Sequence, residues 1–361
     1  MKVDVAIVGT GPAGGAAAMR LARSGARVVV LEQASLPRPK ACGGLVPEAA
    51  LHRVSRDWSE LVGNRVERRK YLKNHGCPHV THTPDSVLAL VDRARFDSGI
   101  VELALELGRG NLDLLERFRV TAVEECADRV LIRSSDGQLV EARYLIAADG
   151  AASRTARCLE LNSSKMNAVG VDTEVVVSDE VYQTFSDHVL FDYFCLPVGY
   201  GWVFPKGNST LSVGVASWDR RVACKAAMAD YLDYTLSRGD IITTTSRAHP
   251  IPVYQGRARI ASARACLVGD AASLVDPVTG EGIRFALRSG LIAAQSILEL
   301  LNDEVATETD HDDCRLYQDR LYASMGPHLD ALNAFAVLPF RQAPGLYYRR
   351  FVTGGQAKAY K

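Results

Sequence analysis

Two continuous apolar runs, at residues 3–8 and 28–31, flank a glycine-rich segment and a helical pattern at the start of the chain. Short apolar runs bounded by turn residues are typical of strands buried on both faces, as in a parallel sheet. The glycines of residues 9–15 lie between the first run and the helical pattern. This order predicts a strand, a glycine turn, a helix and a second strand.

The next part of the chain predicts one long helix and several strands. An apolar run at residues 87–91 predicts a strand, and the helix after it has apolar positions at Ile100, Leu103, Leu105 and Leu107. Further strands are predicted at residues 120–123, 130–132, 139–140 and 144–148. Asp136 and Gly137 form a hairpin turn signal among them. Residues 51–85 are polar and show no pattern that assigns them to an element.

The composition becomes β-rich from about residue 168 to residue 254. Strands are predicted at residues 168–177, 189–196, 202–204 and 210–216. Aromatic residues concentrate in this region, at Phe185, Phe191, Tyr193, Phe194, Tyr200, Trp202 and Phe204. An antiparallel sheet with one aromatic face would wall a large apolar cavity, although the same side chains would also serve simply as the core of the sheet.

The last part of the chain is predominantly helical. A helix is predicted with its apolar face at Ile283, Leu287, Leu291, Ala294 and Leu298. An acidic linker at residues 303–313 leads to a C-terminal segment with aromatic, apolar and basic residues at Phe335, Leu338, Phe340, Arg341, Leu346, Tyr347, Tyr348, Arg349, Arg350 and Phe351. This mixture suits a membrane interface, and it suits a lid over the β-rich region equally well.

The length of 361 residues is too great for one ordinary core and predicts two intertwined domains. The patterns place residues 1–75, 92–165 and 255–305 in a discontinuous α/β domain. Residues 76–91 and 166–254 form a β-rich substrate domain, and residues 306–361 form a helical C-terminal segment.

Charge and cysteine usage exclude several classes of protein. The chain has 42 Lys and Arg against 42 Asp and Glu, so it lacks the basic surface that nucleic-acid binding needs. Its 8 cysteines contain no C-x-x-C pair or metal-ligand spacing, which indicates reduced thiols. His75, His79 and His82 are also too irregularly spaced for a metal site on a helix face, so we expect no metal.

The N-terminal segment and the lengths of the apolar runs predict where in the cell the protein is found. The first predicted strand begins at residue 3, which leaves no room for a signal peptide before it. No run of about 18 apolar residues is present, so no membrane-spanning helix is predicted. We expect a cytoplasmic protein, with contact to a membrane from one side as an open alternative.

The glycine turn has the form of a dinucleotide-binding site. Gly9 permits a tight turn, Gly11 lets backbone N–H groups approach a pyrophosphate, and Gly14 lets the helix pack close to the strand. The pyrophosphate would bind at the helix N-terminus, where unpaired N–H groups and the helix dipole favour negative charge. Glu32, at the end of the second strand, would accept hydrogen bonds from a ribose 2′-OH and repel a 2′-phosphate. These residues do not distinguish between FAD and NAD as the bound dinucleotide.

Two later segments favour FAD over NAD. Asp149 and Gly150 follow a buried strand, at the edge where open α/β sheets bind ligands. Asp270, which follows Gly269 and another buried strand, would meet a ribose or ribityl hydroxyl chain. The turn at residues 280–282 aims a second helix N-terminus at the same ligand, where its positive end would stabilise a flavin ring that becomes anionic on reduction. A NAD site has no use for this second, distant set of contacts, whereas FAD does.

A proline- and glycine-rich loop at residues 37–44 contains a cysteine. Gly43 and Gly44 allow the backbone to approach something flat or bulky, which Cys42 would face. A surface turn with an incidental thiol is the alternative. Arg93, at a strand-to-helix corner, would meet a phosphate or a ring carbonyl, or would be an ordinary solvated basic residue.

The glycine turn with Glu32, the Asp149 segment and the Asp270 segment occur together in flavoproteins built like para-hydroxybenzoate hydroxylase. Within that group the chain resembles the geranylgeranyl reductase family over nearly its whole length. Residues 37–44 match the family's P-x-x-x-x-C-G-G loop, and residues 200–206 match its Y-x-W-x-F-P-K motif.

Further matches and departures concern single positions. Arg93, Phe96 and Asp97 match the family's arginine corner, whereas Leu45 stands where the family's loop usually has a third glycine. The C-terminal region is also shorter than in many members, which puts a long-chain substrate in doubt.

The resemblance implies a fold and a set of cofactor contacts. The fold is a Rossmann-like FAD-binding domain of the glutathione reductase type, with an inserted antiparallel β-sheet substrate domain and a helical C-terminal segment. The FAD contacts, including those argued above, are Gly9, Gly11, Pro12, Ala13, Gly14, Glu32, Gln33, Ala41, Cys42, Gly43, Gly44, Arg93, Val120, Asp149, Gly150, Gly269, Asp270, Pro277, Gly280, Gly282 and Ile283.

The family reduces isolated C=C bonds in prenyl chains with non-covalent FAD, which implies a lipophilic substrate here. We expect Cys42 at the reacting face, with Tyr200 and Trp202 shaping the pocket, and no side chain is identified as the proton donor. Electrons would come from NAD(P)H docking transiently, since no second dinucleotide fingerprint occurs, or from a ferredoxin-like protein. An FAD-dependent monooxygenase acting on a lipophilic or aromatic substrate is the main alternative, and a binding protein that uses FAD as a sensing group is a third.

Overall fold

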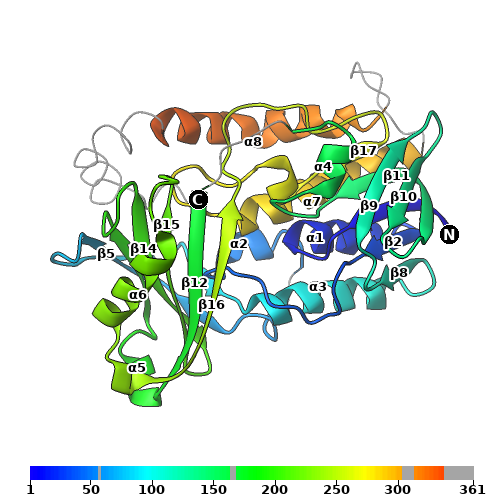
Figure 1. Cartoon of the computed structure of the whole chain (residues 1–361). Helices are drawn as coiled ribbons and strands as arrows, with labels where there is room; N and C mark the ends of the chain where they lie inside the picture. The colour runs from blue at the N-terminus through cyan, green and yellow to red at the C-terminus, as the bar shows by residue number, and fades with distance from the viewer. Residues whose placement is uncertain (56–57, 163–167, 303–312, 337–361) are drawn as a thin grey trace. The chain divides into compact units, whose positions relative to one another are not determined.

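The computed structural model describes residues 1–55, 58–162, 168–302 and 313–336. Its residues form two compact units (Figure 1). Unit 1 consists of residues 1–38, 97–166 and 252–333, and unit 2 consists of residues 39–96 and 167–251 with the described residues from 334 onward.

Unit 1 is built on a seven-stranded sheet in the order β8-β2-β1-β11-β10-β9, with β17 also paired to β11. Its strands are β1 (Lys2–Val8), β2 (Val28–Leu31), β8 (Leu112–Leu115), β9 (Val120–Glu125), β10 (Val130–Ser134), β11 (Leu139–Ala147) and β17 (Ala265–Leu267). Neighbouring strands pair in parallel from β8 to β11, and so do β11 and β17. The predicted strand–helix–strand start of the chain is therefore confirmed.

Strand β11 joins two segments that the sequence pattern predicted as separate strands. Its first half alternates in burial and pairs antiparallel with β10, whereas its last residues are buried throughout and pair in parallel with β17. Strand β1 pairs in parallel with β11 from Glu141 to Ala147, across both halves. The break in the hydrophobic pattern therefore marks a change of surroundings within one strand.

The helices of unit 1 cover this sheet. They are α1 (Pro12–Leu21), the greater part of α3 (Arg93–Leu107), α4 (Arg154–Cys158), α7 (Ile283–Leu301) and α8 (Arg315–Phe335), with the 3₁₀ helix η2 (Gly269–Ala272). Small residues let helices α1 and α7 approach closely (Figure 1), since a Cβ added at Gly290 would lie 2.1 Å from the carbonyl oxygen of Ala13. A Cβ at Gly15 would likewise lie 2.6 Å from the side chain of Ile100 on α3.

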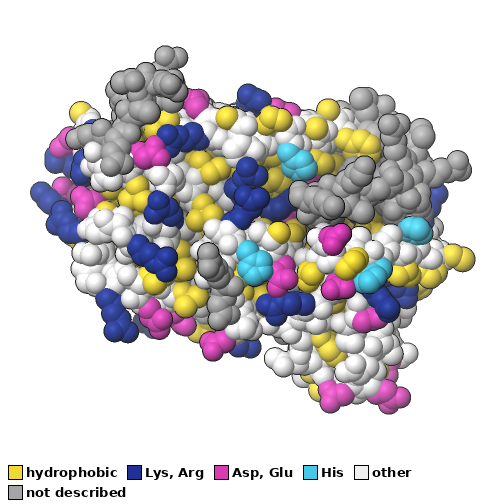
Figure 2. All heavy atoms as spheres, turned by 180° about the vertical axis from the view of Figure 1, so that it is seen from behind, with side chains coloured by type: hydrophobic (Ala, Val, Ile, Leu, Met, Phe, Trp, Pro, Cys, Tyr) yellow, Lys and Arg dark blue, Asp and Glu magenta, His cyan; other side chains and the backbone are white. Residues whose placement is uncertain are grey.

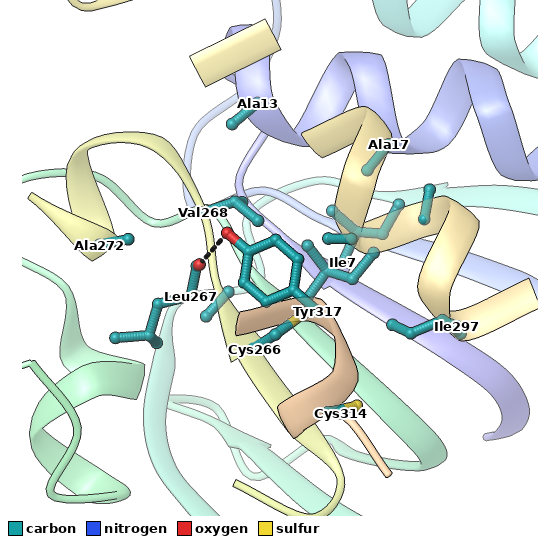
Figure 3. Close-up of a cluster of buried hydrophobic side chains, with 14 of the residues drawn as sticks. Ile7, Ala13, Ala17, Cys266, Leu267, Val268, Ala272, Ile297, Cys314 and Tyr317 are labelled. Carbon is teal, nitrogen blue, oxygen red and sulfur yellow. Dashed lines mark hydrogen bonds between the residues drawn. The ribbon is translucent and has the colours of Figure 1, made fainter. Parts of the chain in front are cut away.

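Helix α8 is part of the core of unit 1. Tyr317 is fully buried between Ile7, Cys266 and Ile297, and its hydroxyl group donates a hydrogen bond of 2.8 Å to the carbonyl oxygen of Leu267 (Figure 3). The hydrophobic pattern predicts a separate helical segment at residues 306–361. The amphipathic pattern alone did not show that Tyr317 fills a gap beside β17.

Unit 2 contains a second seven-stranded sheet, in the order β16-β12-β15-β14-β13-β5-β6. Its strands are β5 (Arg68–Lys73), β6 (His79–His82), β12 (Ala168–Val177), β13 (His188–Tyr193), β14 (Gly199–Gly207), β15 (Thr210–Ser217) and β16 (Ile241–Ile251). All neighbours pair antiparallel except β5 and β13. The predicted β-rich region therefore forms the expected antiparallel sheet.

A small sheet and short helices complete unit 2. The sheet has the order β3-β7-β4, with β3 (Leu45–Pro47), β4 (Asn64–Val66) and β7 (Leu88–Leu90). The helices are α2 (Glu48–Leu51), α5 (Asp179–Gln183), α6 (Cys224–Thr235) and the 3₁₀ helix η1 (Arg238–Asp240).

The boundary between the two units differs from the expected one. Residues 39–75, expected in the first domain, lie in unit 2 because β5 pairs with β13 and because β3 and β4 pair with β7. Strand β5 is mostly basic, and only Tyr71 and Leu72 bury large apolar side chains. Its membership of the sheet therefore left no alternating pattern in the sequence.

Acidic and basic side chains are interspersed on the face of the molecule drawn in Figure 2, in keeping with the equal totals of the two kinds. Within the described part of the chain, no helix is long and apolar enough to span a membrane.

Candidate functional site

Gly9 and Gly14 are required by the packing of the protein itself. Gly9 ends β1 with a φ of +100°, and a Cβ there would lie 2.4 Å from the carbonyl oxygen of Ala148. A Cβ at Gly14 would lie 2.0 Å from the carbonyl oxygen of Gly9. Gly9 thus allows the sharp turn after β1, and Gly14 allows α1 to lie close against that turn.

The backbone conformation at Gly11 does not require a glycine. Its φ of −67° and ψ of 179° are accessible to any residue, and it occupies the N-cap position of α1 without a side-chain cap. Ser, Thr, Asp and Asn usually occupy this position because their side chains bind the free N–H groups of the first turn. A glycine here leaves these N–H groups, including that of Ala13, available to an external anion, while Pro12 at the start of α1 has no N–H to satisfy.

Glu32 is held rigidly after the end of β2. Its carboxylate accepts hydrogen bonds from the Thr10 side chain (2.5 Å) and backbone (3.1 Å) and from the backbone N–H of Ala34 (3.0 Å). Arg38 Nε lies 3.2 Å from the same carboxylate. Burial alone would raise the pKa of Glu32, but Arg38 and these hydrogen bonds outweigh burial and hold the pKa below its usual value. The side chain is therefore ionised and orientated to accept further hydrogen bonds.

Thr10 and Arg38 were missed by the sequence analysis. Arg38 also reaches the buried Asp97, with 3.4 Å between its Nη1 and the Asp97 carboxylate. A threonine inside a glycine turn and an arginine between two prolines carry no sequence signal of their own. Gln33, by contrast, was predicted as a cofactor contact and is exposed.

Asp149 follows β11 as expected, but its carboxylate is occupied by the start of α4. It accepts hydrogen bonds from Ser153 Oγ (2.6 Å), Arg154 N (2.8 Å) and Thr155 N (3.0 Å). Its observed role is therefore to cap that helix. Contact of Asp149, Gly150 and Val120 with a cofactor stays a prediction.

Asp270 lies beside the N-terminus of α7. A Cβ added at Gly282, the N-cap of α7, would lie 3.4 Å from Asp270 Oδ1. Within the described residues, nothing donates a hydrogen bond to the carboxylate of Asp270, which leaves it able to bind hydroxyl groups. Gly269 adopts a φ of +56°, and its N–H donates to Ser289 Oγ (2.9 Å), which fixes the turn.

The segment between Asp270 and α7 includes three more predicted contacts. Pro277 is buried, and Gly280 adopts a φ of +73°. Ile283 is the first residue of α7, with 5% of its surface exposed. Like Gly11, Gly282 provides no side-chain cap for the helix that it begins. The uncapped N-termini of α1 and α7 and the carboxyl groups of Glu32 and Asp270 fit the phosphates and hydroxyl groups of an extended dinucleotide such as FAD.

Replacement of Asp270 by alanine is expected to weaken FAD binding by about 1.5–3 kcal/mol, roughly 10- to 100-fold, as for a lost hydrogen bond to a charged group. Flavin affinity is measured by fluorescence titration of the apoprotein. Asp319→Ala, on helix α8, is the control, and equal affinities of the two variants would show that Asp270 does not contact FAD.

In unit 2, the loop at residues 41–44 lies against β14. A Cβ added at Gly43 would lie 2.8 Å from the ring of Phe204 and 3.3 Å from Trp202 Nε1. A Cβ at Gly44, whose φ is +74°, would lie 2.1 Å from the carbonyl oxygen of Val91. The flat and bulky group that Gly43 approaches is thus the protein's own aromatic strand, whereas Gly44 approaches the backbone at Val91.

A buried polar network holds this loop and β14 together. Trp202 Nε1 donates a hydrogen bond to Ser212 Oγ (2.9 Å), and Ser212 donates to the buried carboxylate of Asp172. Burial raises the pKa of the Asp172 carboxyl group, and the backbone N–H of Cys42 is among the neighbouring groups that act in the opposite direction. The loop therefore meets the sheet at the position of Cys42, which is half-buried.

Lys206, the last residue of the aromatic motif, is nearly fully buried beside this network. Its Nζ lies 2.8 Å from the carboxylate of Glu174. Burial alone would lower the pKa of Lys206, but Asp172 and Glu174 outweigh burial and raise it above its usual value. The ammonium group is therefore charged. Asp172 and Ser212 carry no motif signal, because they meet the loop only through the folded sheet.

Tyr200 and Trp202 are 8% and 6% exposed and belong to an aromatic cluster on the sheet of unit 2. Tyr200 packs against Trp202 and Trp218, with ring centroids 5.8 and 5.9 Å apart. Phe191 and Phe204 extend the cluster, with centroids 5.1 Å apart. A role of Tyr200 and Trp202 in shaping a substrate pocket stays a prediction.

Replacement of Gly43 by alanine is expected to destabilise the protein by about 1–3 kcal/mol, because the buried rings of Phe204 and Trp202 must move to admit the new methyl group. Gly239→Ala, at a position with nothing within 4 Å, is the control and is expected to change stability by under about 0.5 kcal/mol. Urea denaturation measures both values. Equal stabilities would show that the loop does not depend on this packing.

Three basic residues lie together in unit 2 near the same loop. Lys40 Nζ is hydrogen-bonded to His249 Nε2, and Arg93 is buried at the start of α3. Burial, Lys40 and Arg93 together lower the pKa of His249 to about 3, so its imidazole is neutral. The predicted contacts of Ala41 and Arg93 with a cofactor remain predictions.

An open hollow of about 580 Å³ in unit 2 contains none of the predicted site residues. Its charged lining residues pair with one another, as Arg65 does with Glu48 and Arg68 with Asp187. It does not suit a lipophilic ligand. The aromatic and basic C-terminal residues proposed for a membrane interface or a lid lie outside the described residues, apart from Phe335.

Fold and site together define a flavin-dependent oxidoreductase. The chain matches the model of the FAD binding domain family over residues 2–317, and it belongs to this family. Curated relatives include the menaquinone reductase of Mycobacterium tuberculosis, 31% identical over 313 residues that cover 81% of this chain and 76% of the relative. Another is digeranylgeranylglycerophospholipid reductase 1 of Methanopyrus kandleri, 30% identical over 333 residues, 89% of this chain and 86% of the relative.

Solved structures share the fold. A geranylgeranyl bacteriochlorophyll reductase-like protein from Thermoplasma acidophilum superposes with a TM-score of 0.73 at 22% identity, covering 94% of this chain and 92% of the other. The p-nitrophenol 4-monooxygenase of Pseudomonas putida gives 0.76 at 19% identity, covering 99% and 96%. The predicted resemblance to the geranylgeranyl reductase family, the fold class and the flavoprotein character are confirmed.

Proposed function

We propose that this protein is an FAD-dependent reductase that saturates C=C bonds in a prenyl chain or another lipophilic substrate. The observation that carries the proposal is the anchoring of the Cys42 loop on β14, which brings the family's cysteine and its aromatic motif together in one unit. Relatives named as reductases of menaquinone and of a digeranylgeranyl lipid support the choice of substrate class.

The residues of unit 1 hold the cofactor in this proposal. The N-terminus of α1 at Gly11 binds the pyrophosphate, Glu32 binds the adenosine ribose, and Asp270 binds the ribityl chain. The N-terminus of α7 at Gly282 places its positive dipole end toward the ring. FAD, when bound, supplies the hydride that is transferred to one carbon of the double bond.

Unit 2 provides the surroundings of the substrate in this proposal. An isolated alkene has no carbonyl group to polarise, so binding geometry and exclusion of water must supply much of the catalysis. Tyr200 and Trp202 shape an apolar pocket, and Cys42 faces the reacting carbons. Electrons come from NAD(P)H or from a ferredoxin-like protein, and the C-terminal aromatic and basic residues contact the membrane in which a prenyl lipid resides.

The proposal is tested by product analysis. The protein reconstituted with FAD is supplied with a prenylated quinone and with NADH, NADPH or a reduced ferredoxin. Mass spectrometry is expected to detect products that have gained two hydrogen atoms for each saturated bond. Absence of such products with all three donors, or products that have gained oxygen, would contradict the proposal.

A monooxygenase remains the second candidate because the p-nitrophenol 4-monooxygenase has the same fold. An identity of 19% between the two chains establishes the fold alone. A requirement for molecular oxygen separates the two activities.

A further inference from the structure

An acidic side chain, Glu281, is enclosed in the turn that leads into α7. Only 6% of its side chain is exposed, and neither carboxylate oxygen has a hydrogen-bond partner. Arg284 Nη2 lies 3.1 Å from one of these oxygens. A buried carboxylate normally accepts several hydrogen bonds, so the ion pair with Arg284 stands alone in stabilising the charged form among the described contacts of Glu281.

Two charged groups of unit 1 act on the Glu281 carboxyl group: Arg284 of α7 and Asp276 of the preceding turn. His328 of α8 faces the same arginine and aspartate, and its ring stacks on Phe285 with centroids 6.1 Å apart. Asp276 is itself occupied in the turn, where its Oδ1 accepts hydrogen bonds from Val278 N (2.7 Å) and Thr279 N (3.2 Å).

These surroundings favour a neutral carboxyl group at Glu281. Burial raises the pKa of Glu281 to about 7, against the effect of Arg284 and with a further contribution from Asp276. Burial, Arg284 and Arg288 lower the pKa of His328, so this imidazole is neutral near pH 7. Glu281 is thus the group of this cluster that changes charge near neutral pH.

The position of Glu281 connects this cluster with the cofactor site. It lies between Gly280 and Gly282, and Gly282 is the uncapped N-terminus of the 19-residue helix α7. A Cβ at Gly282 would lie 3.4 Å from Asp270 Oδ1, the acid assigned to the ribityl chain. An ionised carboxylate in this turn opposes the helix dipole that would stabilise negative charge on a ligand.

We propose that Glu281 takes up a proton when the bound FAD is reduced, so that electron transfer to the cofactor is coupled to protonation of this carboxyl group. The proposal rests on the cofactor assignment made above. The nicotinamide donor loses a hydride, which is two electrons and one proton, and the ring that gains it acquires one negative charge. A proton from solvent then forms the O–H bond at Glu281 and balances that charge.

The direction of the pH effect follows from electrostatics. A new negative charge nearby raises the pKa of a carboxyl group. Above pH 7 the carboxyl group is therefore ionised beside the oxidised cofactor but protonated beside the reduced one, until the pH exceeds the higher pKa of the reduced state. In that window reduction takes up an additional proton, and the midpoint potential falls more steeply with pH than it does below pH 7.

The test compares Glu281→Gln with the wild type. Glutamine keeps the shape of the side chain and cannot be ionised. The matched control is Glu299→Gln near the far end of α7, where the half-buried Glu299 pairs with Arg320 at 2.6 Å. The midpoint potential of the bound FAD is measured by equilibration with a redox dye across the neutral pH range.

The wild type and Glu299→Gln are expected to show the steeper segment above pH 7. Glu281→Gln is expected to lack it, to match the wild type below pH 7, and to have the higher potential above pH 7 because it has no negative charge. Parallel pH profiles for all three proteins would overturn the proposal while leaving the FAD assignment intact. Absence of bound flavin in the wild type would instead contradict the proposed function.

A second measurement does not depend on the folding of the variant. Proton uptake on reduction of the wild-type holoprotein is followed with a pH indicator in weakly buffered solution. The number of protons taken up per two electrons is expected to be larger just above pH 7 than below pH 6. A constant number across this range would overturn the proposal even if Glu281→Gln cannot be purified.

Discussion

A Gly11→Val protein is expected to fold and to lack FAD. The backbone at Gly11 is extended, with φ −67° and ψ 179°, so valine fits there without backbone strain. Its side chain would occupy the space in front of the first turn of α1, where the pyrophosphate binds in our account. Loss of two or more charge-assisted hydrogen bonds corresponds to about 3–6 kcal/mol, roughly 10²- to 10⁴-fold in affinity.

Circular dichroism and thermal unfolding would verify the fold of this variant, and the absorbance of bound flavin would report its cofactor content. Gly239→Val, at a position with nothing within 4 Å, is the control for the introduction of a valine. Gly9 and Gly14 are not used for this test, because substitutions at those two positions would disturb the protein's own backbone contacts. A folded Gly11→Val protein with full flavin content would show that the turn does not bind the pyrophosphate.

The Cys42→Ala variant is expected to retain its fold and FAD but to reduce its substrate slowly. In our account the thiol faces the reacting carbons, whereas the loop meets the sheet through its backbone, where the N–H of Cys42 acts on the carboxyl group of Asp172. Alanine preserves that backbone contact. If the thiol assists proton delivery, its loss should lower the rate of alkene reduction by roughly 10²-fold or more, the usual range for a general acid.

Measuring the reductive and oxidative half-reactions separately shows which of the two steps the substitution slows. Stopped-flow absorbance is expected to show a normal rate of flavin reduction by the donor and a slowed reoxidation by the alkene. Cys77→Ala removes an exposed thiol of the same unit and is the control. Unaltered alkene reduction by Cys42→Ala would restrict the P-x-x-x-x-C-G-G loop to a packing role.

The parts of unit 1 that the sequence predicted are those formed by local, continuous patterns. Strands β1 and β2 are uninterrupted apolar runs, and the turn between β1 and α1 needs glycine at Gly9 for its positive φ. These features depend on neighbours in the chain, so they leave a readable signal. The same holds for the strand ending before Asp270 and for the amphipathic helix α7.

The missed features depend on partners distant in sequence. Strand β5 is mostly basic, and only its pairing with β13 makes it part of a sheet. A role for Asp172 was not predicted, because Asp172, Ser212 and Cys42 belong to three separate segments of unit 2 that come together only in the folded structure. Asp149 was predicted from a motif to contact the cofactor, but its carboxylate accepts hydrogen bonds from the first backbone N–H groups of α4.

The C-G-G loop shows why a motif alone does not define a role. The sequence interpretation assigned Gly43 and Gly44 to close approach by a flat ligand. The structure accounts for both glycines through Phe204, Trp202 and the carbonyl oxygen of Val91. A glycine pair has the same sequence signature whether the flat group belongs to a ligand or to the protein itself.

The most direct test of the central claim is a single turnover without oxygen. The FAD-loaded protein is reduced in an anaerobic cell and mixed with a prenylated quinone, while flavin absorbance and product mass are followed. We expect the flavin to be reoxidised and the product to gain two hydrogen atoms and no oxygen. Reoxidation that occurs only after oxygen is admitted, with an oxygen atom incorporated in the product, would contradict the assignment as a reductase.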